Sequence, residues 1–317
     1  MKAIQIMAPG KPQIVEVPVP KIKSNEVLVK VKACVTCPHW DITLFRGVDI
    51  FERPGYPHYP IPPGYPGHEM AGEVTAVGAR VKKLKVGDRV ATLCTAGEDV
   101  PGFYADFANR PENTVVRLTD NVSFETAASM EMSRYVRAHI KMLNLKGLRA
   151  GVVGLGPAGL IALQMFKAMG AREVVAIDIQ PDRLKKARSL GATETVNSAD
   201  PAQIQKLVRK PLQASVDCTG AAAGLQVALD HTRGPVAVFG VVHGDAKFNT
   251  RHWFQGTWIP QRFGPDEQDT QFVLDLWRKK QLDTASLISV TLPFAEYAKG
   301  IQMLMDRQAI RVCYVPE

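Results

Sequence analysis

The amino-terminal part of the chain alternates apolar and polar positions, which is typical of half-buried β-strands. Apolar side chains recur at Ile4 and Ile6 and then at Val27, Val29 and Val31, with lysines nearby. Successive side chains of a strand point to opposite faces of a sheet, so a spacing of two places one face against a core. The pattern predicts antiparallel strands between residues 1 and 35.

Further short strands are predicted up to about residue 118. They contain valines, with glycines at the turns between them: Val74, Val77, Val81, Val86, Val90, Gly78 and Gly87. Prolines and glycines crowd residues 54–67, and both residue types interrupt regular elements. This stretch is predicted to be an irregular surface loop.

A different pattern begins at Ser123. A helix is predicted over Phe124–Leu143, and short apolar runs then alternate with helical segments, as in parallel strands joined by helices. The predicted strands are Gly151–Val153, Val174–Ile177, Ala214–Cys218 and Val236–Val242, and the helices between them include Ala158–Met169 and Pro181–Leu190. After Pro260 the alternation stops, and the remaining predicted elements are the helices Glu267–Lys280 and Phe294–Arg307 and a last strand, Ile310–Val315.

A chain of 317 residues suits two domains with separate cores. We expect a β-rich domain made of residues 1–122 and 262–317. Residues 123–261 are expected to form an inserted domain with a doubly wound parallel sheet.

Composition narrows the choice of partners and compartment. Lys and Arg number 39 against 31 Asp and Glu, a net charge of +8 that favours anionic ligands such as a dinucleotide. The basic residues are spread along the chain, so no nucleic-acid partner is expected. The five cysteines have no regular spacing, the chain does not open on a secretory pattern, and no apolar run resembles a membrane span. We expect a cytoplasmic protein with no membrane partner.

A glycine-rich turn lies between a predicted strand and a predicted helix. Gly154, Gly156, Pro157, Ala158 and Gly159 belong to a G-x-G-x-x-G pattern. Such glycines allow a tight turn and let the start of a helix approach a pyrophosphate closely. Alternatively, these glycines only form a turn of the chain and bind no ligand.

The end of the next predicted strand indicates which dinucleotide binds. Asp178 lies nineteen residues beyond Gly159, where a carboxylate accepts hydrogen bonds from the ribose hydroxyls and repels the extra phosphate of NADP. Arg183 weakens this preference slightly, because a nearby cation tolerates a phosphate. Thr219, after the third predicted strand, is a further candidate for cofactor contact. We predict NAD as the cofactor, with NADP less favoured.

Three residues offer the donor atoms that catalytic zinc takes from proteins. Cys37, His68 and Glu131 supply a thiolate, an imidazole and a carboxylate. No fixed local spacing links them, and each also has a structural reading, as a small buried side chain, a loop histidine and a helix-surface carboxylate. Composition and spacing therefore leave the metal open.

Two motifs add a resemblance to a known family. Residues 67–74 read G-H-E-M-A-G-E-V, and residues 86–90 read V-G-D-R-V. The whole chain resembles the medium-chain dehydrogenase/reductase superfamily, and more closely its zinc-containing alcohol, polyol and threonine dehydrogenases. The resemblance implies a GroES-like catalytic domain with an inserted Rossmann domain.

The resemblance also implies roles for individual residues. In such enzymes the histidine of G-H-E binds catalytic zinc and the next glutamate can bind it during ligand exchange, which implies His68 and Glu69. Residues 33–37 resemble a segment whose second cysteine is a ligand, here Cys37. Residues 127–131 resemble a stretch in which polyol dehydrogenases carry a glutamate, here Glu131. Whether Glu69 or Glu131 completes the zinc shell stays open.

The residues after Cys37 depart from the family pattern. The acidic residue comes one position later than in the family, in the run Cys37, Pro38, His39, Trp40, Asp41. We expect His39 to replace the family's hydroxyl as the relay for the substrate proton. We expect Asp41 to orient His68.

Three more expectations follow from the resemblance. Residues 89–115 contain one cysteine, Cys94, so we expect one catalytic zinc and not the structural zinc of many relatives. Arg311 matches a basic residue of the last strand that reaches the cofactor pyrophosphate. The strand Val236–Val242 lies where family members pair subunits, so a homodimer or homotetramer is expected.

Together these features predict a zinc-dependent enzyme that transfers hydride between NAD and a small alcohol, with a carbonyl compound as product. Primary and secondary alcohols, polyols and sugar alcohols fit this reaction. One alternative is a zinc-free quinone or enoyl reductase of the same superfamily that uses NADPH. The other is a nucleotide-binding protein without catalytic activity.

Overall fold

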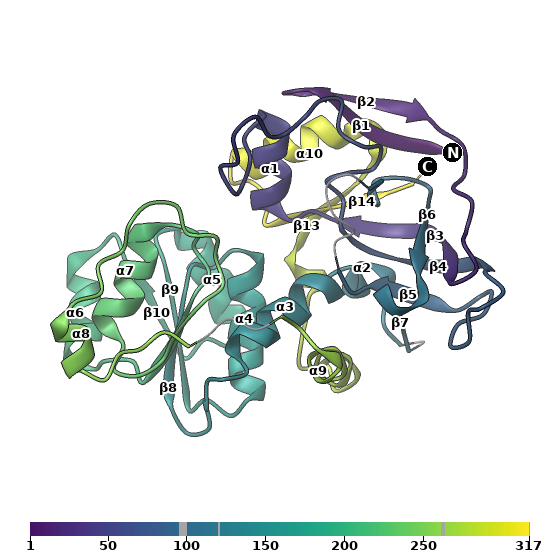
Figure 1. The fold of residues 1–317 in the computed structure, drawn as a ribbon. Helices are drawn as coiled ribbons and strands as arrows, with labels where there is room; N and C mark the ends of the chain where they lie inside the picture. The colour runs from purple at the N-terminus through teal and green to yellow at the C-terminus, as the bar shows by residue number, and fades with distance from the viewer. Residues whose placement is uncertain (95–99, 120, 261–263, 317) are drawn as a thin grey trace. The chain divides into compact units, whose positions relative to one another are not determined.

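The computed structural model describes residues 1–94, 100–119, 121–260 and 264–316. It divides into two compact units, Met1–Met132 with Thr284–Glu317, and Ser133–Asp283 (Figure 1). The first boundary follows Met132, whereas the sequence predicts it after residue 122, so Glu131 belongs to the first unit. The second boundary follows Asp283, and the predicted one at 261/262 lies outside the described residues.

The first unit contains a two-stranded sheet and a larger, mostly antiparallel sheet. β1 (Lys2–Ala8) and β2 (Lys11–Glu16) form the small sheet. The large sheet has the strand order β13-β14-β3-β4-β5-β7, and β6 also pairs with β3. Its strands are β3 (Glu26–Val35), β4 (Glu69–Val77), β5 (Arg89–Thr92), β6 (Phe107–Pro111), β7 (Val115–Arg117), β13 (Ile288–Pro293) and β14 (Arg311–Val315).

The alternating positions of the first strands form the core, as the sequence predicts. Ile4 and Ile6 of β1 are fully buried, and the valines of β3 pack in the same apolar cluster. Two predicted strand positions are wrong, because Val81 and Val86 lie outside the strands and Val86 is 60% exposed. The sequence also missed β13, which pairs with β14 in parallel.

Residues 54–67 contain no helix or strand, as predicted, but the second half of this stretch is not at the surface. Ile61 and Tyr65 are buried. The N–H groups of Ile61 and Gly64 donate to the carbonyl oxygens of Ile6 and Ile4 in β1. The loop is buried because a strand satisfies its backbone polar groups, and it holds His68 at the start of β4.

The helices of the first unit are short. α1 (Pro38–Arg46) begins after Cys37, with proline at the first helical position, where its missing N–H is harmless. α10 (Tyr297–Met305) lies beside α1 (Figure 1). The predicted helix Phe124–Leu143 is two helices, α2 (Phe124–Ala127) and α3 (Met130–Ile140), and α3 continues into the second unit. Among the described residues, short 3-10 helices span Glu112–Thr114, Ala285–Leu287 and Phe294–Glu296.

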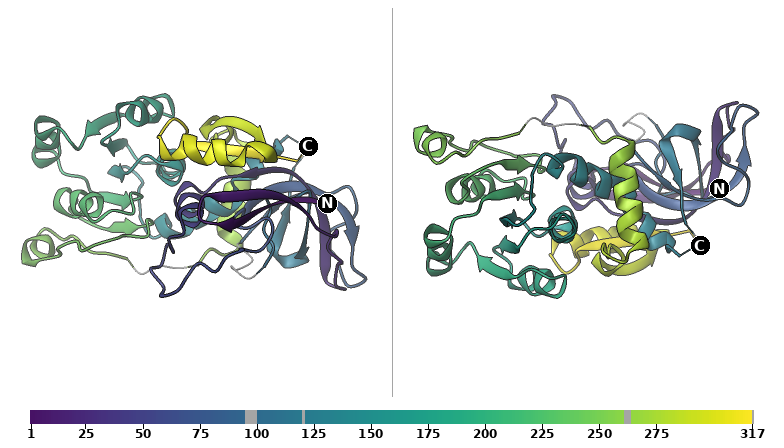
Figure 2. Two further views of the ribbon diagram at one scale, coloured as in Figure 1. Left: turned by 90° about the horizontal axis from the view of Figure 1, so that it is seen from above. Right: turned by 90° about the horizontal axis from the view of Figure 1, so that it is seen from below.

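The second unit is built on a five-stranded parallel sheet with the order β10-β9-β8-β11-β12. Figures 1 and 2 show helices on both faces of this sheet. The four predicted strands are present, but the last one ends at Val238 and not at Val242. β10 was missed because three of its four residues are polar. The strands are β8 (Arg149–Val153), β9 (Glu173–Asp178), β10 (Glu194–Asn197), β11 (Ala214–Asp217) and β12 (Val236–Val238). The helices are α4 (Pro157–Ala168), α5 (Pro181–Ser189), α6 (Pro201–Arg209), α7 (Ala222–His231), α8 (Thr250–Phe254) and α9 (Glu267–Arg278).

This strand order reverses direction between β8 and β11, which is the point where doubly wound sheets bind ligands. The glycine-rich turn follows β8 and Thr219 follows β11. In the described ranges, no helix has the length and apolar composition needed to cross a bilayer. The expected cytoplasmic location stays a prediction.

Candidate metal and dinucleotide sites

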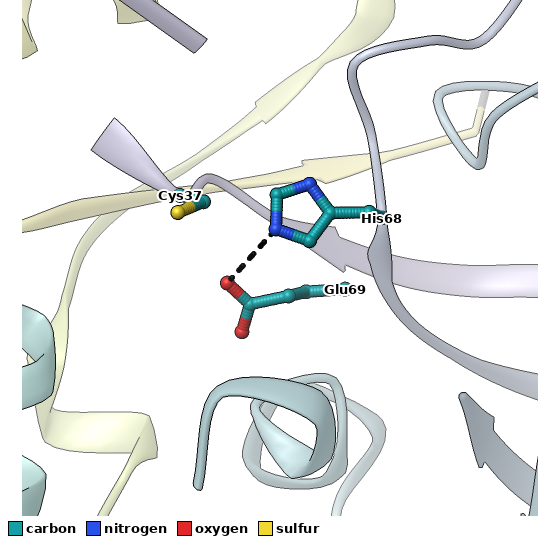
Figure 3. A group of neighbouring side chains, drawn as sticks. All are labelled: Cys37, His68 and Glu69. Atoms are coloured by element: carbon teal, nitrogen blue, oxygen red, sulfur yellow. Dashed lines mark ion pairs between the residues drawn. The ribbon is translucent and has the colours of Figure 1, made fainter. Parts of the chain in front are cut away.

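Cys37, His68 and Glu69 come together in the first unit. One donor atom from each of them lies within 4.8 Å of the others (Figure 3). The pairing of β3 with β4 causes this, because Val35 at the end of β3 lies opposite Glu69 at the start of β4. Cys37 follows Val35 by two residues and therefore reaches the same end of the sheet.

His68 is held in the form that binds a metal. Its Nδ1 lies 2.9 Å from the carbonyl oxygen of Pro66, so Nδ1 carries the proton and donates. Nε2 then presents its lone pair and lies 4.0 Å from Oε1 of Glu69. Burial lowers the pKa of His68 to about 4, which keeps the imidazole neutral at physiological pH.

Glu69 forms a fully buried ion pair with Arg311. Nη2 of Arg311 lies 2.6 Å from Oε1 of Glu69, and neither side chain is exposed. The same guanidinium donates from Nε to the carbonyl oxygen of Thr36 at 2.8 Å and from Nη1 to Oγ of Ser129 at 3.0 Å. Burial raises the pKa of Glu69, and the charge of Arg311 opposes that shift. Arg311 therefore fixes Glu69 from the side of β14.

Asp41 holds the backbone of Cys37 instead of the ring of His68. Its Oδ2 accepts the Cys37 N–H at 2.8 Å, and its Oδ1 accepts the hydroxyl of Tyr104 at 2.6 Å and that of Tyr297 at 3.4 Å. Burial raises the pKa of Asp41 to about 7. The expectation that Asp41 orients His68 is corrected, because the carbonyl of Pro66 does so.

The residues of this cluster fit a zinc ion. Burial raises the pKa of the Cys37 thiol well above its usual value, and the charges of Glu69 and Asp41 raise it further. Neighbouring acids raise one another's pKa because their negative charges repel. A divalent cation bound between them would relieve this repulsion. A thiol, a neutral imidazole and a carboxylate are the donors that zinc prefers in catalytic sites.

Glu131 lies near this cluster but outside its 4.8 Å group. Its side chain is buried, and its charge also raises the pKa of Cys37. Glu131 therefore contributes to the negative potential of the site. Its role as a zinc ligand stays a prediction, as does the proton relay through His39, which is exposed on α1.

The glycine-rich turn of the second unit has the geometry of a phosphate cradle. Gly154 has φ +85°, which favours glycine, and Gly156 is the residue that caps α4. A Cβ on Gly156 would meet nothing within 4 Å, whereas a Cβ on Gly159 would lie 1.8 Å from the carbonyl oxygen of Gly154. Gly159 thus permits close packing of α4, and Gly156 leaves the helix start open for an anion. Pro157 and Ala158 form the first turn of α4.

Asp178 ends β9 beside this turn. Its Oδ2 accepts the N–H of Leu155 at 2.6 Å, and its Oδ1 accepts that of Gln180 at 2.8 Å. Arg183 lies close enough for its pKa to be raised by the charge of Asp178, although burial lowers it overall. Thr219 also borders the turn, because a Cβ on Gly154 would lie 2.6 Å from its methyl group. Asp178 and Thr219 therefore lie at the glycine-rich turn, as predicted for residues that contact the cofactor.

Both family models that match the chain are models of dehydrogenase domains. Residues 23–120 match the model of the alcohol dehydrogenase GroES-like domain, and residues 157–276 match that of the zinc-binding dehydrogenases. An alcohol dehydrogenase from Geobacillus stearothermophilus is 36% identical over 225 residues, 62% of this chain and 64% of that protein. An L-threonine 3-dehydrogenase from Francisella philomiragia is 26% identical over 96% of this chain and 95% of that protein. The crystal structure of 2R,3R-butanediol dehydrogenase from Bacillus subtilis has a TM-score of 0.88 at 23% identity and covers 100% of this chain and 99% of that chain.

The chain belongs to the zinc-containing medium-chain dehydrogenase/reductase superfamily. Its first unit is the GroES-like domain, and the parallel sheet of its second unit is that of a Rossmann domain. The superfamily implies zinc and a nicotinamide cofactor. Arg311 lies in the first unit with Glu69 as its partner, and its predicted contact with the cofactor pyrophosphate stays a prediction.

Sequence reasoning missed the residues that hold this candidate metal site in place. Tyr104 and Tyr297 bind Asp41 from positions 63 and 256 residues away along the chain. The pairing of Arg311 with Glu69 was missed in the same way. The contacts of His68 with Pro66 and of Asp41 with Cys37 are local, but each involves a backbone atom, which a pattern of side chains does not reveal.

Metal analysis of purified protein tests the cluster. We expect about one zinc per chain in the wild type and almost none in His68→Ala, because the imidazole is one of only three protein donors. His58→Ala is the matched control, since His58 is an exposed histidine outside the cluster. Glu131→Gln should keep its zinc if Glu69 completes the shell. A folded wild type without zinc after metal addition would contradict the site and favour the zinc-free reductase.

Proposed function

We propose that this protein is a zinc-dependent dehydrogenase that transfers hydride between NAD and a primary or secondary alcohol, including polyols and sugar alcohols. The convergence of Cys37, His68 and Glu69 carries the proposal. The dehydrogenase relatives and the glycine-rich turn beside Asp178 support it.

The zinc site is prepared by the chain's own contacts. Bound zinc would supply a Lewis acid that lowers the pKa of a substrate hydroxyl. Cys37 and His68 would hold it with Glu69 or Glu131. Asp41 fixes the backbone of Cys37, and Pro66 fixes the ring of His68, so both donors are oriented before metal binding.

The proton of the substrate hydroxyl needs a route to water. His39 is the candidate, because it lies two residues after Cys37, is exposed, and carries an imidazole that can exchange protons near neutral pH. In this proposal His39 accepts the proton on the solvent side of the site. The buried Asp41 is occupied by Cys37 and Tyr104.

The turn of the second unit would hold the cofactor. The open start of α4 at Gly156 would receive the pyrophosphate, and Asp178 would accept the ribose hydroxyls. Bound NAD would take the hydride from the carbinol carbon. Arg183 beside Asp178 leaves some tolerance for NADP.

Steady-state kinetics with NAD and NADP tests the function. Wild type should oxidise alcohols with NAD, and Asp178→Asn should lower kcat/KM for NAD by about 10- to 100-fold while affecting NADP less, since it loses charged hydrogen bonds to ribose. Asp182→Asn, at an exposed acid in the first turn of α5, is the control. A wild type that turns over no alcohol with either cofactor would exclude the proposal, and a preference for NADP would exclude its NAD part.

The proton relay has its own test. His39→Ala should slow alcohol oxidation near pH 7 by about 10- to 100-fold, the size of a lost general base, and should keep its zinc. The slowing should shrink at high pH, where hydroxide can remove the proton. The same pH profile of kcat in variant and wild type would reject this role for His39.

We also propose that the protein is a homodimer or homotetramer. β12 is the last strand of its sheet, and Pro235 pairs with Trp258 beside it. Exposed apolar side chains follow within residues 248–259: Phe248, Trp253, Phe254, Trp258 and Ile259. A strand at the end of its sheet next to such a patch favours association.

Light scattering tests the association. The wild-type protein should have two or four times the mass of one chain. The Trp253→Glu variant should be monomeric, because the substitution would bury a charge in the interface. Val208→Glu is the control, at an exposed apolar residue of α6 outside the patch. A monomeric wild type at micromolar concentration would be incompatible with this proposal.

A further inference from the structure

Two aromatic rings extend from His68 toward solvent in the first unit. The ring of Trp40 meets that of His68 edge-on, with 5.6 Å between centroids and an angle of 62°. The ring of Phe51 meets Trp40 in the same way, at 5.7 Å and 80°. We refer to Trp40 and Phe51 as the aromatic wall. It begins at a residue of the metal cluster and is therefore next to the place where substrate would react.

The Trp40 end of the wall is held by a partly buried hydrogen bond. Trp40 lies in the first turn of α1, and its indole N–H donates to the hydroxyl of Tyr65 at 2.7 Å. Tyr65 belongs to the loop that β1 holds in the core, and it is 4% exposed. This bond fixes the plane of the indole next to His68.

The Phe51 end is held by a clamp on the loop after α1. Arg53 donates from Nε and Nη2 to the two carboxylate oxygens of Asp49, at 2.7 and 2.6 Å. Its guanidinium stacks over the ring of Tyr56 at 4.0 Å and faces that of Phe51 at 5.5 Å. Asp49 is 5% exposed, and its contact with Arg53 lowers the pKa of Asp49 to about 2. The loop is thus ordered by a charged pair, which places Phe51 against Trp40.

Phe51 remains open to a ligand in spite of this ordering. Its side chain is 51% exposed, and Trp40 is also partly exposed. An aromatic side chain that is fixed but half in water gains apolar contact when a flat group covers it. A polyol offers the wall hydroxyl groups, which would give up water without finding a hydrogen-bond partner there.

We propose that the aromatic wall selects the substrate, and that the preferred substrates are alcohols carrying an aromatic or other flat unsaturated group near the carbinol carbon. The reaction at that carbon rests on the proposed function, whereas recognition of the ring depends only on Trp40 and Phe51. Phe51 is a specificity-determining residue in this proposal. Asp49 and Arg53 are positioning residues that act through it.

Binding can be measured without turnover. Saturation-transfer NMR on the full-length protein as purified, with benzyl alcohol and without NAD, should transfer magnetisation to the ring protons of the probe. The transfer should fall several-fold in Phe51→Ala. Val48→Ala is the matched control, because Val48 is an apolar residue of the same loop, 52% exposed, and outside the wall. Glycerol should receive little magnetisation from any of the three proteins.

Kinetics gives the second measurement. We compare the ratio of kcat/KM for benzyl alcohol to that for ethanol, so that a general loss of activity cancels. The ratio should fall by about tenfold in Phe51→Ala, the size expected for one lost ring contact with its buried area, and should be restored in Phe51→Tyr. Arg53→Met should lower the ratio in the same direction, since it releases the loop. Val48→Ala should retain the wild-type ratio.

The outcomes separate this inference from the proposed function. Saturation transfer that depends on Phe51, in a protein that oxidises no alcohol, would support the wall and exclude the dehydrogenase reaction. Alcohol oxidation with equal ratios in Phe51→Ala and Val48→Ala would support the reaction and overturn the wall. A higher kcat/KM for glycerol than for benzyl alcohol would overturn it as well.

Discussion

The candidate metal site depends on one buried ion pair, that of Glu69 with Arg311. The guanidinium of Arg311 joins the start of β4 to β14, and it also donates to Thr36 after β3 and to Ser129 before α3. Burying two charges costs several kcal/mol for each ion, so such a pair is weak evidence for stability. Its effect here is geometric, because one planar cation fixes the ends of three strands around Cys37 and His68. The charge of Arg311 offsets the raised pKa of Cys37 and Asp41 only in part, because burial still raises both, and a divalent cation would compensate the rest.

The sequence predicted the elements that depend on residues close together in the chain. It missed the contacts between segments that are far apart in the chain. Ile4 and Ile6 are buried because of a spacing of two, and the turn at Gly154 follows from the lack of a side chain. His68 and Glu69 are neighbours in the chain, so a short motif was enough to find both. Thr36 lies 275 residues from Arg311, and no pattern in either segment reports the other. The chemistry of Cys37 made it a candidate donor, but only the resemblance placed it in the site, since its spacing from His68 carries no geometric signal.

Composition correctly predicts one of two structural properties of the loop before His68. Its prolines and glycines correctly predict that it has no helix or strand, yet they do not predict its burial. Burial follows from backbone hydrogen bonds to β1 at Ile61 and Gly64, and those depend on the path of the chain. The burial of this loop affects the metal site, because the loop contains Pro66, whose carbonyl orients His68. A mobile surface loop would have left the imidazole free to turn.

Burial has opposite effects on the two kinds of side chain around the site. For the acids it raises the pKa, so Asp41 and Cys37 keep their protons more readily than in water. A cation bound there would reverse that shift, so metal binding and proton release are coupled through the same burial. For Trp40 and Phe51, incomplete burial leaves apolar area that a ligand can still cover. In the proposed function the cluster would therefore select the ion, and the half-exposed rings beside it would select the molecule that approaches that ion.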